Sequence, residues 1–136
     1  MVAVGAVIED GKGRILLVKH KPERGGFWRG KWICPGGALE LGETIDEGIK
    51  REVKEETGLE IDLVKLLPPY DRIVKSTDGV SLHVVYIDCL AKLVGGELEV
   101  GSDVGEALWV EKQNINQIWG ELHEDTQRLM KIAGLV

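Results

Sequence analysis

The sequence predicts a mixed α/β or α+β fold, in which a β-sheet packs against helices. Segments with the hydrophobic pattern of strands come before, between and after two segments with the pattern of amphipathic helices. The chain has 136 residues, of which 43% are hydrophobic, so it is long and apolar enough to bury one sizeable core. We therefore expect a single domain over residues 1–136.

The first expected elements are two strands and a loop. Residues 2–9 and 14–20 are apolar runs, and the glycine-containing turn at residues 10–13 between them indicates a hairpin. Residues 21–31 are rich in glycine and in cationic side chains, which is typical of a loop. The short apolar run at residues 32–34 ends at a Pro-Gly-Gly sequence.

Two helices are expected, one central and one terminal. Residues 44–57 have Thr44 as a candidate N-cap, and Glu47, three residues later, completes a capping box. Gly58 follows where a helix needs a residue that accepts a left-handed backbone. Residues 123–133 form the second helix.

Three further strands are expected after the central helix. Residues 59–67 are apolar and end at two prolines. The strongest strand pattern in the chain covers residues 80–94 and is followed by two glycines. Residues 106–111 form a last short strand.

Charge and composition exclude several classes of protein. With 17 basic and 23 acidic residues the formal net charge is −6, so nucleic acid is not expected as a partner. The longest aliphatic run, residues 15–18, is far shorter than the roughly 20 residues that cross a bilayer, and no signal-type segment precedes it. Two cysteines cannot build a disulfide framework. We expect a cytoplasmic protein with no membrane partner.

The central helix concentrates acidic side chains on one face. At about 100° per residue, Ile49 and Val53 define an apolar stripe, and Glu56 falls inside it. Glu52 and Glu55 flank Glu56, so three like charges crowd together. A solvated acidic face would explain Glu55 but not the inward position of Glu56. Arg51 can neutralise only part of this cluster, and a hard divalent cation such as Mg²⁺, which prefers carboxylate oxygens, would satisfy the rest.

The segment from Gly37 to Leu59, GALELGETIDEGIKREVKEETGL, is more specific than the helix alone. It resembles the Nudix box, G-x5-E-x7-R-E-U-x-E-E-x-G-U, in which U is a bulky aliphatic residue. Seven fixed identities match at Gly37, Glu43, Arg51, Glu52, Glu55, Glu56 and Gly58, and Val53 and Leu59 match the aliphatic positions. Chance gives such a match with a frequency on the order of 10⁻⁸ per starting position. The resemblance therefore identifies the chain as similar to Nudix hydrolases.

This resemblance implies a fold, a cofactor and a set of site residues. The implied fold is an α/β/α sandwich with a mixed β-sheet between helices. The implied cofactor is Mg²⁺ or Mn²⁺, bound by the box glutamates with help from the Gly37 carbonyl. The resemblance assigns metal binding to Gly37, Glu43, Glu52, Glu55 and Glu56, and assigns Arg51, Glu52 and Glu55 to the catalytic group, with Arg51 orienting the carboxylates.

The general base is open between the box and the region after the long strand. Glu52 is the candidate within the box. Glu106 lies where several members of the family place a further metal ligand or base, and Glu97 and Glu99 compete with it. Homodimers are common in the family, so a homodimer is a further expectation.

The candidates for substrate binding lie outside the box. Trp28, in a glycine-rich loop, and Tyr70, after two prolines, could line a nucleoside site, and core packing explains Trp28 about equally well. Candidates for phosphate contact are the cations that precede the box, whose ordinary role is as solvated loop charges: Lys19, Lys21, Arg24, Arg29 and Lys31. Three histidines lack any metal-ligand spacing and are expected to be structural or surface residues: His20, His83 and His123.

The implied reaction is metal-dependent cleavage of the pyrophosphate bond of a nucleoside diphosphate derivative. The glycine-rich region around residues 95–106 resembles the loop of archaeal and bacterial ADP-ribose hydrolases and also that of sanitising nucleoside triphosphate hydrolases. An ADP-ribose-like substrate is slightly favoured. Alternatives are a MutT-type hydrolase of an (oxidised) nucleoside triphosphate, a dinucleoside polyphosphate hydrolase and an RNA 5′-end hydrolase. A nucleotide-sensing module without activity is the non-enzymatic alternative. Such modules commonly lose box glutamates, which this chain keeps.

Overall fold

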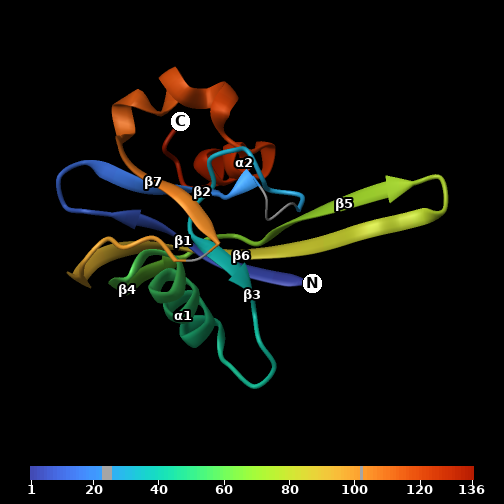
Figure 1. Cartoon of the computed structure of the whole chain (residues 1–136), viewed down its shortest axis with the longest axis horizontal. Coiled ribbons are helices and arrows are strands. Elements are labelled where there is room, and N and C mark those ends of the chain that lie inside the picture. The colour runs from blue at the N-terminus through green and yellow to red at the C-terminus, as the bar shows by residue number, and fades with distance from the viewer. Residues whose placement is uncertain (23–25, 102) are drawn as a thin grey trace.

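The computed structural model of the chain describes residues 1–22, 26–101 and 103–136. One sheet runs through the molecule, with helix α1 on one side and the helical segments η2 and α2 on the other (Figure 1). The elements, in chain order, are β1 (Val2–Glu9), β2 (Arg14–His20), β3 (Gly36–Ala38), α1 (Ile45–Thr57), β4 (Leu59–Leu66), β5 (Tyr70–Ser76), β6 (Gly79–Gly96), β7 (Val104–Glu111), the 3₁₀ segment η2 (Lys112–Glu121) and α2 (Glu124–Ile132).

The sheet is mixed, as the sequence predicts. Its strand order is β4-β6-β1-β2-β7, with β3 paired to β1 and β5 paired to β6. Strands β1 and β6 run parallel, and the other pairings are antiparallel. Because β3 pairs with the first half of β1, the start of the Nudix-like segment lies against the centre of the sheet.

Alternating side chains of the central strands build a core on each face of the sheet. On one face, Ile8 of β1 packs in a cluster with Ile49 and Val53 of α1. On the other face, Val7 packs in a cluster that includes Met130 of α2. The helix that carries the box glutamates is therefore anchored to the sheet by its apolar stripe.

The ends of α1 lie where the capping residues predict. The Thr44 hydroxyl accepts a hydrogen bond from the backbone N–H of Glu47, at 3.2 Å. Gly58 has a φ of 74°, and its backbone N–H donates to the Lys54 carbonyl. The helix thus stops one residue before β4 begins, which fixes how far its last turn reaches along the sheet.

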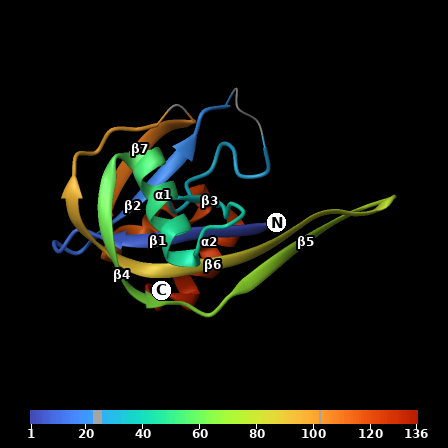
Figure 2. The ribbon, with the colours of Figure 1, turned by 90° about the horizontal axis from the view of Figure 1, so that it is seen from below.

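Three elements differ from the sequence prediction. Residues 70–76 form β5, which pairs with an extended first half of β6, and this hairpin projects from the body of the molecule (Figure 2). Residues 36–38 form β3 instead of a plain turn, and residues 112–121 form a 3₁₀ segment. In the described part of the chain, no helix combines the length and the hydrophobicity needed to cross a membrane.

Candidate active site

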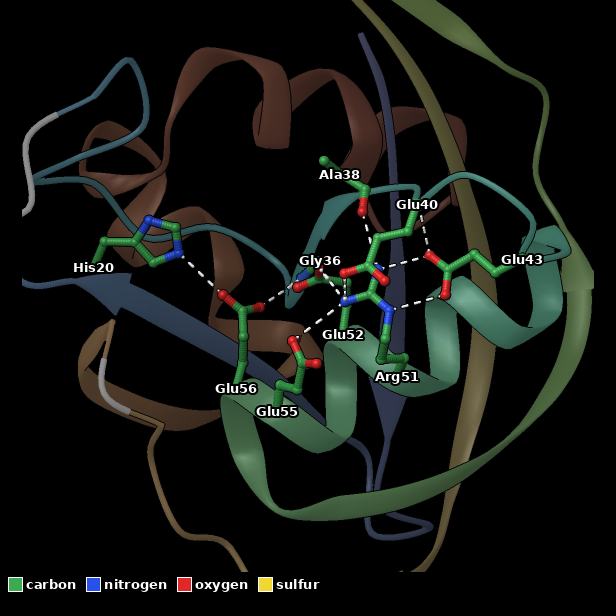
Figure 3. Close-up of polar contacts among 9 residues, drawn as sticks. All are labelled: His20, Gly36, Ala38, Glu40, Glu43, Arg51, Glu52, Glu55 and Glu56. Carbon is green, nitrogen blue, oxygen red and sulfur yellow. Dashed lines mark hydrogen bonds and ion pairs between the residues drawn. The ribbon is translucent and has the colours of Figure 1, made fainter.

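Glu56 is the most deeply placed carboxylate of the box. Its side chain points toward the sheet, and the residue is only 7% exposed, as the position within the apolar stripe predicts. The backbone N–H of Gly36 donates to Oε1 of Glu56 at 2.7 Å, and Nε2 of His20 lies 3.1 Å from Oε2 (Figure 3). Groups on β2 and β3 therefore hold both oxygens of a carboxylate that belongs to α1.

Arg51 holds the other carboxylates of the box together (Figure 3). Its Nε and Nη2 atoms donate to the two oxygens of Glu43 at 2.9 and 2.7 Å. Its Nη1 atom donates to Oε1 of Glu52 at 2.8 Å and to Oε2 of Glu55 at 3.2 Å. A further bond from Nη2 reaches the Ala38 carbonyl at 3.0 Å. One guanidinium thus links the β3–α1 loop to two turns of the helix.

The two ends of this network differ electrostatically. The hydrogen bonds from Arg51 hold the pKa of the Glu43 carboxyl down at about 2. Burial raises the pKa of Glu52, and the neighbouring charges of Glu56 and Glu55 raise it further, against the lowering effect of Arg51. A positive charge placed near Glu52 would relieve this repulsion, whereas Glu43 already has its counter-ion.

The backbone approaches the box carboxylates closely at Gly37. A Cβ atom on Gly37 would overlap the carboxylate group of Glu52. The neighbouring Gly36 packs against the backbone of β1, where a Cβ atom would lie 2.9 Å from the Cα of Gly5. The glycine pair therefore allows β3 to pass between the central strand and the acidic face of α1.

A cavity of about 640 Å³ opens beside these residues. Its lining includes the box residues Gly37, Glu52, Glu55 and Glu56, together with Trp28, Tyr70, Tyr86, Asp88 and Asp125. No Lys or Arg side chain is among the described residues that line the cavity. Its size suits a small-molecule ligand, and its walls carry acidic side chains without a matching set of cations.

A second polar network holds Trp28, Tyr86 and Asp125 of the cavity lining. Arg72 donates two hydrogen bonds to Oδ1 of Asp125, at 2.9 and 2.6 Å. The Tyr86 hydroxyl donates to the other oxygen of Asp125 and accepts a hydrogen bond from the indole N–H of Trp28 at 2.9 Å. The rings of Tyr70 and Tyr86 stack with centroids 4.7 Å apart. Strands β5 and β6, helix α2 and the loop before β3 are thereby joined around the cavity.

The structure separates the predicted site residues outside the box into two groups. Trp28 and Tyr70 line the cavity. Lys19, Arg29 and Glu106 are not among the described residues that line it. Lys19 instead lies over the ring of Trp32, 4.6 Å from its centroid, and 3.9 Å from the Glu106 carboxylate. Arg24 lies outside the described residues.

His20 is the site residue that the sequence does not reveal. The expectation that it is structural or at the surface misses its contact with Glu56, because the two residues are 36 positions apart and a single histidine has no ligand spacing. His83 pairs with Asp71 at 3.1 Å on the projecting hairpin, far along the chain from the box. His123 caps the first turn of α2 through its Nδ1 atom.

The donor set suits a hard divalent cation. Glu52, Glu55 and Glu56 all line the cavity, and carboxylate oxygens are preferred by Mg²⁺ and Mn²⁺. In the described part of the chain, no group of three or more His, Cys, Asp or Glu side chains already has the arrangement of a metal site. Arg51 and His20 occupy some of the carboxylate oxygens instead.

Comparison with known proteins agrees with this geometry. Residues 1–129 of the chain match the sequence family described as the NUDIX domain. An ADP-ribose pyrophosphatase from Methanocaldococcus jannaschii is 37% identical over 117 residues, which cover 86% of this chain and 65% of that protein. The nucleoside triphosphatase NudI of Enterobacter sp. (strain 638) is 31% identical, and the match covers 95% of this chain and 94% of that protein.

Solved structures show the same fold. A MutT NUDIX hydrolase from Burkholderia pseudomallei superposes with a TM-score of 0.80 at 26% identity, covering 96% of this chain and 95% of that one. A NUDIX hydrolase from Nitrosomonas europaea superposes with a TM-score of 0.78 at 25% identity, covering 98% of this chain and 87% of that one. The complete box, which runs from β3 through α1 to the start of β4, the mixed sheet and the match over residues 1–129 together show that this chain belongs to the NUDIX domain family.

Proposed function

We propose that the protein is a hydrolase that depends on Mg²⁺ or Mn²⁺ and cleaves the pyrophosphate bond of a nucleoside diphosphate derivative. The observation that carries the proposal is the cavity, where three carboxylates from one helix face a ligand-sized space without a Lys or Arg side chain in its described lining. A pyrophosphate is an anion, so such a cavity can bind it only with cations present.

The box residues would divide the tasks of metal binding and positioning. Glu52, Glu55 and Glu56 would hold the cation, supported by the Gly37 carbonyl and, from farther away, by Glu43. When bound, a divalent ion offsets the charge that develops on the phosphates and lowers the pKa of water. Arg51 keeps the carboxylates in place through four hydrogen bonds, and a fifth reaches the Ala38 carbonyl.

Glu52 is the proposed general base. Burial raises its pKa, and the residue lines the cavity beside Glu55 and Glu56. Glu106 is less well supported in this role, because its side chain is 63% exposed and points to Lys19, outside the described lining.

An ADP-ribose-like substrate is favoured by the M. jannaschii relative, whose name states that activity. A second candidate is a nucleoside triphosphate, because the NudI proteins match nearly the whole length of both chains. The two substrates differ in what lies beyond the phosphates. ADP-ribose has a second sugar beyond its phosphates, whereas a nucleoside triphosphate ends in phosphate.

A hydrolysis screen with product identification tests the proposal. Purified protein is incubated with ADP-ribose, nucleoside triphosphates and dinucleoside polyphosphates, with Mg²⁺ or with Mn²⁺. ADP-ribose should yield AMP and ribose 5-phosphate, and chelation by EDTA should abolish turnover. Glu52→Gln should lose activity by orders of magnitude, whereas Glu47→Gln, on the exposed side of the same helix, should not. Turnover that survives chelation, or the absence of turnover on every substrate with either ion, would overturn it.

A further inference from the structure

Asp88 is a buried carboxyl group that the proposed chemistry does not use. It lies on β6, is 6% exposed and lines the cavity. Its Oδ2 atom is buried and has no hydrogen-bond partner among the described residues. Since buried polar atoms nearly always have a partner, a group of this kind calls for an explanation.

Two polar side chains of this region, Arg72 and Tyr70, have other partners besides Asp88 or in place of it. Arg72 is paired with Asp125 at 2.6 Å and with Glu124 at 3.0 Å. The Tyr70 hydroxyl donates to the main-chain carbonyl of Asp125 at 3.3 Å. Burial raises the pKa of Asp88 to about 7, and the Tyr70 hydroxyl offsets only part of that rise. Oδ2 itself has no partner among the described residues, so a ligand that enters the cavity can supply the missing donor.

The sheet makes room for this carboxyl group. Gly5 on β1 is the partner of Asp88 in the parallel pairing with β6. A Cβ atom on Gly5 would lie 2.7 Å from Oδ1 of Asp88, so any larger residue would displace the carboxyl. The surroundings of Asp88 in the cavity are largely apolar or aromatic, with Cys34, Tyr70 and Leu129 in the lining. A flat ring with one polar edge matches such surroundings.

We propose that Asp88 recognises the nucleobase, with Oδ2 accepting a hydrogen bond from the exocyclic amino group of an adenine that lies in the inner part of the cavity. The inference rests on the proposed function in that the substrate is a nucleotide whose phosphates lie toward Glu52, Glu55 and Glu56. A buried carboxyl group in its neutral form presents a donor beside an acceptor, and the N1 atom and the amino group of adenine present the complementary pair. Asp88 is thus a specificity-determining residue.

The assignment is tested by a thermodynamic cycle in which the amino group of the ligand and the side chain of Asp88 are removed separately and together. Binding of AMP is compared with binding of purine riboside 5′-monophosphate, which lacks the amino group, by titration calorimetry in the presence of Mg²⁺. The wild-type protein should bind AMP about 5- to 150-fold more tightly, because the analogue leaves a buried acceptor unpaired. Asp88→Leu should reduce this ratio to near one, and Asp62→Leu, on the exposed side of β4, should leave it unchanged.

Asp88→Asn keeps an acceptor oxygen with little change in size and should retain most of the preference, so the test does not depend on how Asp88→Leu folds. Equal binding of the two ligands by the wild-type protein, a preference that survives in Asp88→Leu, or its loss in Asp88→Asn would each overturn the assignment. The readout is binding of a product-like nucleotide. If the hydrolysis screen fails but the wild-type protein still prefers AMP, the proposed reaction is overturned. The assignment of Asp88 to the base site then still stands.

Discussion

The imidazole of His20 and the carboxylate of Glu56 form a buried pair, with Nε2 of the histidine 3.1 Å from Oε2 of the glutamate. The histidine ends β2, and the glutamate belongs to the last turns of α1. With the Gly36 N–H on the other oxygen, the carboxylate is fixed at both ends from outside its own helix. His20 therefore positions Glu56 relative to the cavity.

Replacing His20 should weaken metal binding. When a residue that hydrogen-bonds to a metal ligand is mutated, metal affinity or activity typically falls by about 10- to 100-fold. We expect His20→Ala to raise the dissociation constant for Mn²⁺ within that range, measured by electron paramagnetic resonance, and to lower kcat. His20→Gln, whose amide can still reach the carboxylate, should restore part of both.

The matched control is His83→Ala, which breaks a histidine–carboxylate pair of the same 3.1 Å length on the exposed hairpin. It should leave the affinity for Mn²⁺ unchanged. If His20→Ala lowers the melting temperature while Mn²⁺ still binds as tightly as in the wild-type protein, the pair serves folding alone.

Glu56→Gln should abolish most activity, whereas Glu60→Gln should not. Glu56 is buried beside the cavity, and Glu60 is exposed on β4, 3.5 Å from Lys54. Loss of a metal ligand costs orders of magnitude in rate. Melting temperatures with and without Mg²⁺ complete the comparison, because an ion that binds only the folded protein stabilises it. Mg²⁺ should raise the melting temperature of wild type and Glu60→Gln more than that of Glu56→Gln, and equal shifts would remove Glu56 from the metal site.

Trp28→Ala should raise KM and leave kcat largely intact. The indole lines the cavity and is held by its hydrogen bond to Tyr86. If it stacks on the base, the expected loss is about 1–3 kcal/mol, or roughly 5- to 150-fold in KM. Trp109→Ala, on β7 and outside the described cavity lining, should lower stability without this change in KM. Titration of tryptophan fluorescence with substrate in Ca²⁺ gives the affinity directly, and an unchanged affinity in Trp28→Ala would eliminate stacking.

The stability of the protein should depend on pH through Asp88. Burial raises the pKa of this carboxyl from its usual 3.8 to about 7 in the folded state. The folded state therefore binds the proton more tightly, so stability is lost as pH rises through this window, by at most about 4 kcal/mol. Asp88→Asn removes the titrating group and should be more stable than wild type at about pH 8 but similar at about pH 4. Urea unfolding at both pH values measures this, and parallel curves for the two proteins would contradict the shift.

Much of the fold follows from hydrophobic periodicity, and the exceptions have a common cause. The strands that pack on both faces, such as residues 2–9, carry uninterrupted apolar runs and are predicted correctly. Strand β5 lies on the projecting hairpin, where Ile73 is 47% exposed and none of the side chains of the strand is fully buried. The sequence of this strand therefore lacks the apolar run that burial in a core requires. Its turn does contain an Asp-Gly pair at residues 78–79, the one local signal that could have located it.

The residues of the candidate site also differ in whether the sequence alone can place them. Glu56 can be placed from the sequence, because the position of a residue around a helix depends only on local geometry. His20, Asp88 and Asp125 lie on three different elements, and nothing in their own sequence neighbourhoods brings them to one cavity. That requires the parallel pairing of β1 with β6 and the docking of α2, which are long-range features.

The contact between Gly37 and Glu52 also limits which sequences this site can accept. Gly37 lies outside the left-handed region, so its backbone would suit any amino acid, but a side chain there would displace the Glu52 carboxylate from its position beside Arg51. Gly42, in the next loop, is the reverse case, because its φ is 87° and a Cβ atom there would meet no other atom within 4 Å. In a saturation library, asparagine and aspartate should therefore survive selection at position 42, while position 37 should return glycine alone.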